Sequence, residues 1–259
     1  KAAIVAEPTW GDVIPSEGGL FWTRVTIKGR QGHAGLRFNE VWPQRDLPGR
    51  TLPGVNAVEL STRFLAAMRE FESIRCRTSY HPLVPPGLNT INPGVIRGGA
   101  GLGEDGLPII LTNPAIIPDV VVIDLDYKFL PNEDPAEVKK EFESFVHHFC
   151  QQDRWLREHP ITVDWDYSGL YFPPMDTDAN HPVIQSLVNR KTELGKAPVI
   201  KGFEAVTDAA HYAGAGVASV IFGPSGDGFH GYDEYVDLAS LQETTKTIAA
   251  AIIDWCDVR

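Results

Sequence analysis

Two periodicities of apolar residues divide the chain into strands and helices. From Leu20 to Ile27 apolar and polar residues nearly alternate, and the same pattern recurs in "DVVVIDLDY", which is typical of half-buried strands. Between these strands, from about residue 55 to 74, apolar residues recur every three to four positions, which predicts a helix with one buried face. That face comprises Leu60, Phe64, Met68 and Phe71.

A second helix is predicted at "DPAE", where Asp134 is the N-cap, Pro135 lies in the first turn and Glu137 follows three residues after the cap. Its buried stripe comprises Val138, Phe142, Phe145, Val146 and Phe149. Further strands are expected at about residues 88–96 and in "ITVDWDY". The order βαββαβ predicts a ferredoxin-like α+β domain over residues 19–168.

The segments that flank this unit have a different pattern. Residues 1–7 predict a strand, and residues 181–259 predict a helix, a strand in "PVIKGF", a short helix, a strand in "ASVIFGP" and a long helix from Leu238 to Trp255 capped by Asp237. We expect residues 1–18 and 169–259 to form one α/β layer that the ferredoxin-like unit interrupts. Three strands and three helices leave apolar faces without partners. We therefore expect this layer to be partial, with the missing part ahead of Lys1.

Composition narrows the function classes. The 34 acidic and 23 basic residues give a formal net charge of -11, which disfavours nucleic acid and anionic membranes as partners. No apolar run reaches the about 18 residues that a membrane span needs, and no signal peptide is recognisable. The cysteines, Cys76, Cys150 and Cys256, are few and widely spaced, so we expect buried, reduced thiols in a cytoplasmic protein that acts on small molecules.

The loop "GPSGDGFHGYDEYV" is the strongest candidate for chemistry. A nucleophile elbow needs glycine two residues after Ser225, where Asp227 stands. A phosphate-binding loop needs Lys followed by Ser or Thr after the glycines, and this loop has neither. A metal site remains, because His230 offers an imidazole whose second nitrogen Asp233 or Glu234 could orient. For His230 by itself, a solvated loop histidine is the simpler interpretation.

Glu7 makes the metal interpretation stronger. It ends the first predicted strand and precedes a proline, so its carboxylate should emerge at the carboxyl edge of the α/β layer. His230 follows the strand "ASVIFGP" in the same layer, so both side chains should lie on one rim. Taken separately, Glu7 is as easily interpreted as a solvated acid at a strand end.

Six motifs occur in an order that resembles a known family. They are "AAIVAEPT", "VTIKGRQGHAG", "GVNAVE", "NPGVIRGG", "TDAAHYAGAGVASVIFGP" and "HGYDEYV". This order is similar to that of the acetylornithine deacetylase, succinyl-diaminopimelate desuccinylase and carboxypeptidase-G type binuclear metallohydrolases. The resemblance covers essentially the whole chain. Those enzymes also carry a His-x-Asp pair and a Glu-Glu pair ahead of the "EPT" motif, which are not in this sequence.

The resemblance implies a role for each matching residue. Glu7 would be a ligand of one metal and His230 a ligand of the other, with Glu234, beside Asp233, behind the histidine. His33 would reach the partner subunit's site and help to stabilise the oxyanion. Thr207 and Asp208 match a turn that lines the pocket, although a helix N-cap pair explains them equally well.

The resemblance also implies an activity. Two divalent ions, zinc or else manganese or cobalt, would activate water to cleave an amide bond of an N-acyl amino acid, acylated amine or small peptide. The ferredoxin-like domain would be a lid that forms a homodimer. Ala210 and Ala115 replace residues that bind the substrate in the namesake enzymes, so acyl-amino-acid specificity does not carry over.

Two readings of the chain follow. It is expected to be a component or C-terminal fragment of such a hydrolase, inactive by itself because most ligands lie on a missing N-terminal segment or chain. The alternative is a non-catalytic dimerisation module derived from the family. The coding sequence ahead of Lys1 discriminates between them.

Overall fold

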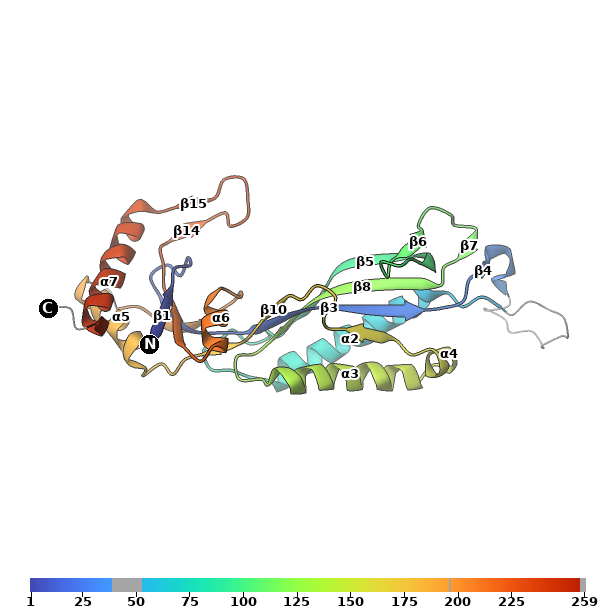
Figure 1. The fold of residues 1–259 in the computed structure, drawn as a ribbon, viewed down its shortest axis with the longest axis horizontal. Coiled ribbons are helices and arrows are strands. Elements are labelled where there is room, and N and C mark those ends of the chain that lie inside the picture. Colours follow the sequence, from blue (N-terminus) through green and yellow to red (C-terminus); the bar gives the residue numbers. More distant parts are fainter. Residues whose placement is uncertain (39–52, 196, 257–259) are drawn as a thin grey trace.

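The computed structural model describes residues 1–38, 53–195 and 197–256. Two sheets lie at opposite ends of an elongated molecule (Figure 1). The five-stranded sheet contains β1 (Ala2–Val5), β2 (Val13–Glu17), β11 (Met175–Asp176), β12 (Ile200–Phe203) and β13 (Ala218–Ile221). Its order is β1-β13-β2-β11, and β12 also pairs with β2.

Helices cover both faces of the five-stranded sheet. They are α5 (Pro182–Glu193), α6 (Ala209–Gly214) and α7 (Leu238–Cys256). One core cluster joins β2 and β13 to α5 and α7 through residues that include Val13, Leu187 and Ala251. A second cluster on the opposite face joins Ile14 to Ala209 of α6. The structure is therefore a mixed α/β fold, with helices on both sides of this sheet.

The expectation of three strands in this layer is wrong, because the sheet has five. Neither β2 nor β11 shows the alternation of apolar and polar residues by which strands are predicted. All five residues of β2 are buried, so its sequence "VIPSE" has no alternation of apolar and polar side chains, and Pro15 argues against a central strand. β11 is only two residues long. Both strands are held by pairing with each other and with segments distant in the chain, because β2 also pairs with β12 and β13.

The six-stranded sheet has the order β10-β3-β8-β5-β6, with β9 paired to β3. Its strands are β3 (Gly19–Lys28), β5 (Ile91–Leu102), β6 (Pro108–Ile110), β8 (Val120–Phe129), β9 (Thr162–Asp164) and β10 (Tyr171–Phe172). The helices α2 (Ala57–Thr78), α3 (Pro135–Gln151) and α4 (Arg154–Glu158) accompany it. The predicted stripes of α2 and α3 enter one core with the inward residues of β3 and β8.

Local signals explain where these helices begin. The side chain of Asn56 accepts hydrogen bonds from the Val58 and Glu59 amides and caps α2. Asp134 does the same for the Ala136 and Glu137 amides, which confirms the predicted start of α3. Asp237 precedes α7, and its carboxylate accepts from the amide of Ser240 in the first turn at 2.6 Å.

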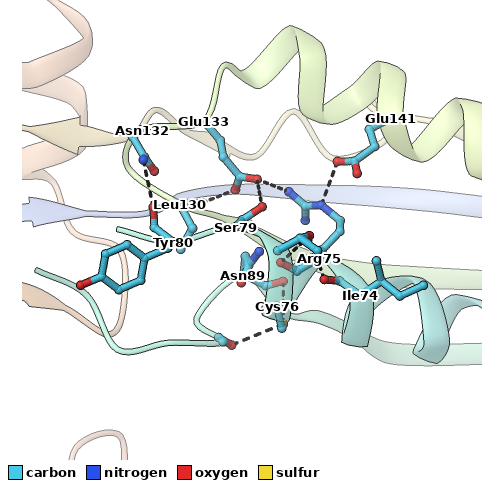
Figure 2. Close-up of polar contacts among 12 residues, drawn as sticks. Ile74, Arg75, Cys76, Ser79, Tyr80, Asn89, Leu130, Asn132, Glu133 and Glu141 are labelled. Atoms are coloured by element: carbon cyan, nitrogen blue, oxygen red, sulfur yellow. Dashed lines mark hydrogen bonds and ion pairs between the residues drawn. The ribbon is translucent and has the colours of Figure 1, made fainter. Parts of the chain in front are cut away.

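A buried arginine ties α2 to α3 (Figure 2). Arg75, 1% exposed, donates from Nη2 to Glu133 Oε1 at 2.7 Å and from Nε to Glu141 Oε2 at 3.0 Å. Glu133 also accepts from the Leu130 amide at 2.6 Å and from the Ser79 hydroxyl at 3.3 Å. The network therefore links the C-terminal turn of α2 to the segment that leads from β8 into α3.

Two short antiparallel strand pairs lie toward opposite ends of the molecule (Figure 1). β4 (Gly32–His33) pairs with β7 (Ile116–Ile117), followed by a 3-10 turn at Ala34–Leu36. β14 (Gly226–Asp227) pairs with β15 (Tyr235–Val236).

None of the described helices combines the length and apolar character that crossing a bilayer requires. The cysteine expectation holds for Cys150, which is buried, but is wrong for Cys256, which is exposed on α7.

Candidate active site

The candidate site lies where β1 and β13 end. The two strands are parallel, with Val5 opposite Ile221, and the Phe222 amide donates to the Val5 carbonyl at 3.0 Å. Parallel strands bring their carboxyl ends to one edge of the sheet. The expectation that the strands preceding Glu7 and His230 end at one rim is therefore confirmed.

Backbone contacts hold the two loops of this rim together. The Trp10 amide donates to the Pro224 carbonyl at 3.2 Å, and the Gly11 amide donates to the Gly223 carbonyl at 3.0 Å. The Gly223 amide in turn donates to Thr9 Oγ1 at 3.0 Å. A Cβ at Gly223 would lie 1.9 Å from the Glu7 carbonyl oxygen, so only glycine allows this approach.

Glu7 is a partly buried carboxylate at this rim. Burial raises the pKa of Glu7 above its usual value, and the negative charge of Asp208 raises it further. Asp208 is thus close enough to Glu7 for their charges to interact. Two acids that repel each other at a rim are typical of a site that gains from a bound cation.

His230 lies on the turn between β14 and β15, with an exposed side chain and a φ of 60°. A non-glycine residue in the left-handed region carries backbone strain, and such strain collects at functional sites. Asp233 and Glu234 follow on the same turn and are also exposed. Beside His230, the Phe229 ring meets Trp10 edge-on, with ring centroids 5.8 Å apart, and links the two loops.

Glu17 was missed by sequence reasoning and lies behind the rim. Its side chain is fully buried at the end of β2, and Oε1 accepts from Thr207 Oγ1 at 3.2 Å. Burial raises the pKa of Glu17 to about 8, against hydrogen bonds from Thr207 and the Ala210 backbone that lower it. Glu17 Oε2 has no hydrogen-bond partner among the described residues. Nothing in the sequence "PSEGG" pointed to this acid as a site residue, because the strand β2 that carries it was not predicted.

Thr207 and Asp208 divide the roles that the sequence left open. Thr207 Oγ1 accepts from the Ala209 amide at 3.1 Å, so this side chain caps α6. Asp208 occupies the N-cap position without a side-chain capping bond. Its carboxylate is exposed and is left to interact with Glu7.

His33 lies far from the other candidates within one chain. It belongs to β4, at the opposite end of the molecule from β1, β14 and β15 (Figure 1). Its side chain is exposed, and Nδ1 accepts from the Gly35 amide at 3.0 Å. The neutral ring therefore carries its proton on Nε2 and presents a hydrogen-bond donor.

The rim offers carboxylate oxygen and imidazole nitrogen, which are donors that zinc and manganese accept. Within residues 1–38, 53–195 and 197–256, no group of three or more His, Cys, Asp and Glu side chains is arranged to hold a metal ion. The donor types fit such an ion, whereas the ligands among the described residues do not complete a site.

Comparison with known proteins identifies relatives. The chain is 32% identical over 264 residues to the N-formyl-4-amino-5-aminomethyl-2-methylpyrimidine deformylase of Bacillus subtilis, covering 98% of this chain and 58% of the relative. It is 24% identical over 261 residues to the acetylornithine deacetylase of Myxococcus xanthus, covering 100% of this chain and 59% of the relative. The chain thus spans less than two thirds of the length of these curated relatives.

The fold has solved counterparts. The structure of aminopeptidase PepT from Bacillus cereus matches with a TM-score of 0.65 at 19% sequence identity, over 97% of this chain and 56% of that one. The family model of peptidase family M20/M25/M40 matches residues 3–254. The chain therefore belongs to peptidase family M20/M25/M40.

Proposed function

We propose that this chain forms part of a binuclear metal-dependent amidohydrolase in which Glu7 and His230 each ligate one of two divalent ions. The observation that carries the proposal is the rim itself. Glu7 and His230 follow the ends of adjacent parallel strands, and the backbone bonds between residues 10–11 and 223–224 hold their loops together. Zinc is the first candidate ion, with manganese or cobalt as substitutes.

A catalytic zinc needs about three protein ligands, so the proposal requires further ligands from outside the described residues, on a longer sequence or on another chain. The longer curated relatives are consistent with that source. When bound, such ions lower the pKa of a water molecule and polarise an amide carbonyl. The raised pKa of Glu7 and its repulsion by Asp208 favour neutralisation of this rim by a cation.

The substrate class follows from the relatives. The curated relatives are named a deformylase and a deacetylase, and both names describe hydrolysis of an amide that joins a short acyl group to an amine. We propose the same bond for this chain, in an acylated amine of low molecular mass. N-acyl amino acids and small peptides are weaker candidates because Ala210 has no side chain that could bind a substrate carboxylate.

The chain's own side chains have defined tasks in this proposal. Glu234 or Asp233 orients the His230 ring through its second nitrogen. Glu17 and Thr207 fix the turn that presents Asp208 toward Glu7.

The part of the six-stranded sheet within residues 19–168, which is all of it except β10, is proposed to be a ferredoxin-like lid, with residues 1–18 and 169–259 forming the partial metal-binding domain. The strand order β9-β3-β8-β5 with α2 and α3 supports this assignment. Exposed apolar side chains on β5, β6 and the adjoining loop, namely Ile96, Ile109 and Leu111, support a homodimer through this unit.

Dimerisation would also explain the position of His33. In one chain it lies at the far end from Glu7 and His230, so it would act in the partner's site. With its proton on Nε2, the neutral ring can donate a hydrogen bond to the developing oxyanion.

The decisive experiment is a zinc titration of the 259-residue chain by calorimetry. Wild-type protein should bind Zn²⁺ weakly, and Glu7→Gln and His230→Ala should each lower the affinity by about tenfold or more, because losing even a hydrogen-bond partner of a ligand costs about 10- to 100-fold. His147→Ala, an exposed histidine on α3, is the control and should change nothing. An N-formylated amine should not be hydrolysed by the chain alone. Equal zinc affinity in all variants, or tight stoichiometric zinc with amidase activity in this chain, would contradict the proposal.

A further inference from the structure

An open hollow lies beside the proposed ligands. It has a volume of about 310 Å³ and is lined by Pro8 and by residues 224–226, 229 and 234–236. Pro8 is the neighbour of Glu7, and Phe229 is the neighbour of His230. The hollow therefore lies between the rim and the β14–β15 hairpin, which stands beyond the end of β1 in Figure 1. We call it the hairpin hollow.

Two exposed aromatic rings line the hairpin hollow. Phe229 is 42% exposed and Tyr235 is 62% exposed. Tyr235 is held by the pairing of β15 with β14, where it lies opposite Asp227. Phe229 makes an edge-on contact with Trp10. The φ of Trp10 is 56°, in the left-handed region that L residues rarely adopt. Backbone pairing and one ring contact thus place these two residues at the hollow, and both rings remain open to solvent.

The polar group of the hollow is an acid. Glu234 lines it and has no ion-pair partner in the described part of the chain. Aromatic faces beside an unpaired carboxylate attract a planar ring that carries a positive charge or amino hydrogens, through stacking and cation–π contact on one side and hydrogen bonding on the other. The volume lies in the range of pockets that hold small ligands.

We propose that the hairpin hollow binds the ring of an amino-substituted heteroaromatic amine, with Phe229 and Tyr235 as stacking surfaces and Glu234 as the acceptor for its amino group. The inference rests on the proposed function, because it makes this ring the amine part of the amide substrate. It adds Phe229 and Tyr235 as residues that select the amine, and it gives Glu234 this task while Asp233 is left to orient His230. Trp10 is a positioning residue that acts through Phe229.

The test is a titration of the 259-residue chain with 4-amino-5-aminomethyl-2-methylpyrimidine in the presence of EDTA. The non-aromatic cyclohexylmethylamine is the matched probe. Phe229→Leu removes the ring while keeping an apolar side chain, Phe229→Tyr restores a ring, and Glu234→Gln removes the charge. Tyr232→Leu is the control, because this fully exposed tyrosine lies on the same hairpin outside the hollow. Circular dichroism establishes that each variant is folded.

We expect Phe229→Leu and Glu234→Gln to weaken binding of the pyrimidine about threefold to tenfold, as the size of aromatic and cation–π contacts predicts. Phe229→Tyr and Tyr232→Leu should keep wild-type affinity for the pyrimidine. Cyclohexylmethylamine should bind more weakly than the pyrimidine, and Phe229→Leu should not change its affinity. No binding to wild-type protein, equal binding of both probes, or unchanged affinity in Phe229→Leu would overturn the inference. Since no metal is present, this result is independent of the zinc titration, so the two proposals can fail separately.

Discussion

Thr207 donates its hydroxyl to the Glu17 carboxyl group across 3.2 Å, and this contact connects the end of β2 to the start of α6. The same Thr207 oxygen accepts from the Ala209 amide and caps α6. Glu17 is fully buried and has no cationic partner in the described structure. We therefore expect the Glu17 carboxyl group, which lies behind the candidate site, to be protonated in the folded chain.

The first prediction concerns pH. The pKa of Glu17 is about 8 in the folded chain, against 4.5 as its ordinary value. The folded state thus holds a proton that the unfolded state releases, so the free energy of unfolding should fall as the pH rises from about 4.5 to 8, by up to about 1.4 kcal/mol per pH unit. Urea unfolding at pH 5, 6, 7 and 8 measures this slope.

The matched variant is Glu17→Gln, which keeps the shape and cannot ionise. Its stability should fall less steeply over the same pH range, while Glu104→Gln, an exposed substitution, should retain the wild-type slope. Identical slopes for wild-type protein and Glu17→Gln would show that Glu17 is already ionised in the folded chain.

The second prediction concerns the buried arginine. Arg75→Met should lower the free energy of unfolding by about 3 to 5 kcal/mol, because Glu133 and Glu141 lose the charge that they face. Arg77→Met on the same helix removes an exposed arginine whose ion pair with Glu70 spans 3.7 Å, and should cost less than about 1 kcal/mol. Chemical denaturation measures both. Similar losses in the two variants would refute a special role for Arg75.

The third prediction tests the close approach at the rim. Gly223→Ala places a Cβ 1.9 Å from the Glu7 carbonyl oxygen, so the backbone must move, at a cost of about 3 kcal/mol. Zinc affinity should fall as well, since Glu7 moves with its loop. In Gly216→Ala the Cβ meets open space, and only the φ of 75° is strained, so about 1 to 2 kcal/mol is expected with zinc affinity unchanged. Equal zinc affinity in both variants is the outcome that contradicts this prediction.

The fourth prediction concerns a contact between the two ends of the molecule. His81, which follows α2, lies with Nε2 3.3 Å from Asp176 Oδ1 on β11, and the Leu83 amide donates to its Nδ1. Loss of this buried partner in His81→Ala should cost about 1 to 3 kcal/mol. Hydrogen exchange should accelerate at the Gly202 amide, which donates to the Leu83 carbonyl. His147→Ala should leave that exchange rate unaltered; acceleration in both variants would refute the local contact.

The sequence predicted those elements whose signals are local. The Asp134 cap and the apolar stripe of α3 are examples, because the cap bonds and the 3.6-residue period depend on near neighbours in the chain. β2 escaped prediction because it is buried on both faces and contains Pro15, so its strand character depends on partners from residues 175–176, 200–203 and 221.

For the candidate site, too, the sequence predicted only the features whose signals are local. Glu7 follows the end of β1 and His230 lies on the loop after β13, and the sequence pattern placed both strands. The left-handed backbone of His230, the burial of Glu17 and the hairpin hollow depend on segments that meet only in the folded chain. No periodicity or spacing encodes these contacts.

The path between the two sheets has a mechanical consequence. β2 leads through Gly18 into β3, while β10 returns into β11 beside it, so Tyr171 pairs with Phe21 and Met175 pairs with Glu17. A Cβ at Gly18 would lie 2.4 Å from the Phe129 carbonyl oxygen, which fixes where the outgoing strand crosses. Two paired strands, rather than one, therefore join the ends of the molecule, so separating the two sheets would require breaking backbone hydrogen bonds on both sides of Gly18.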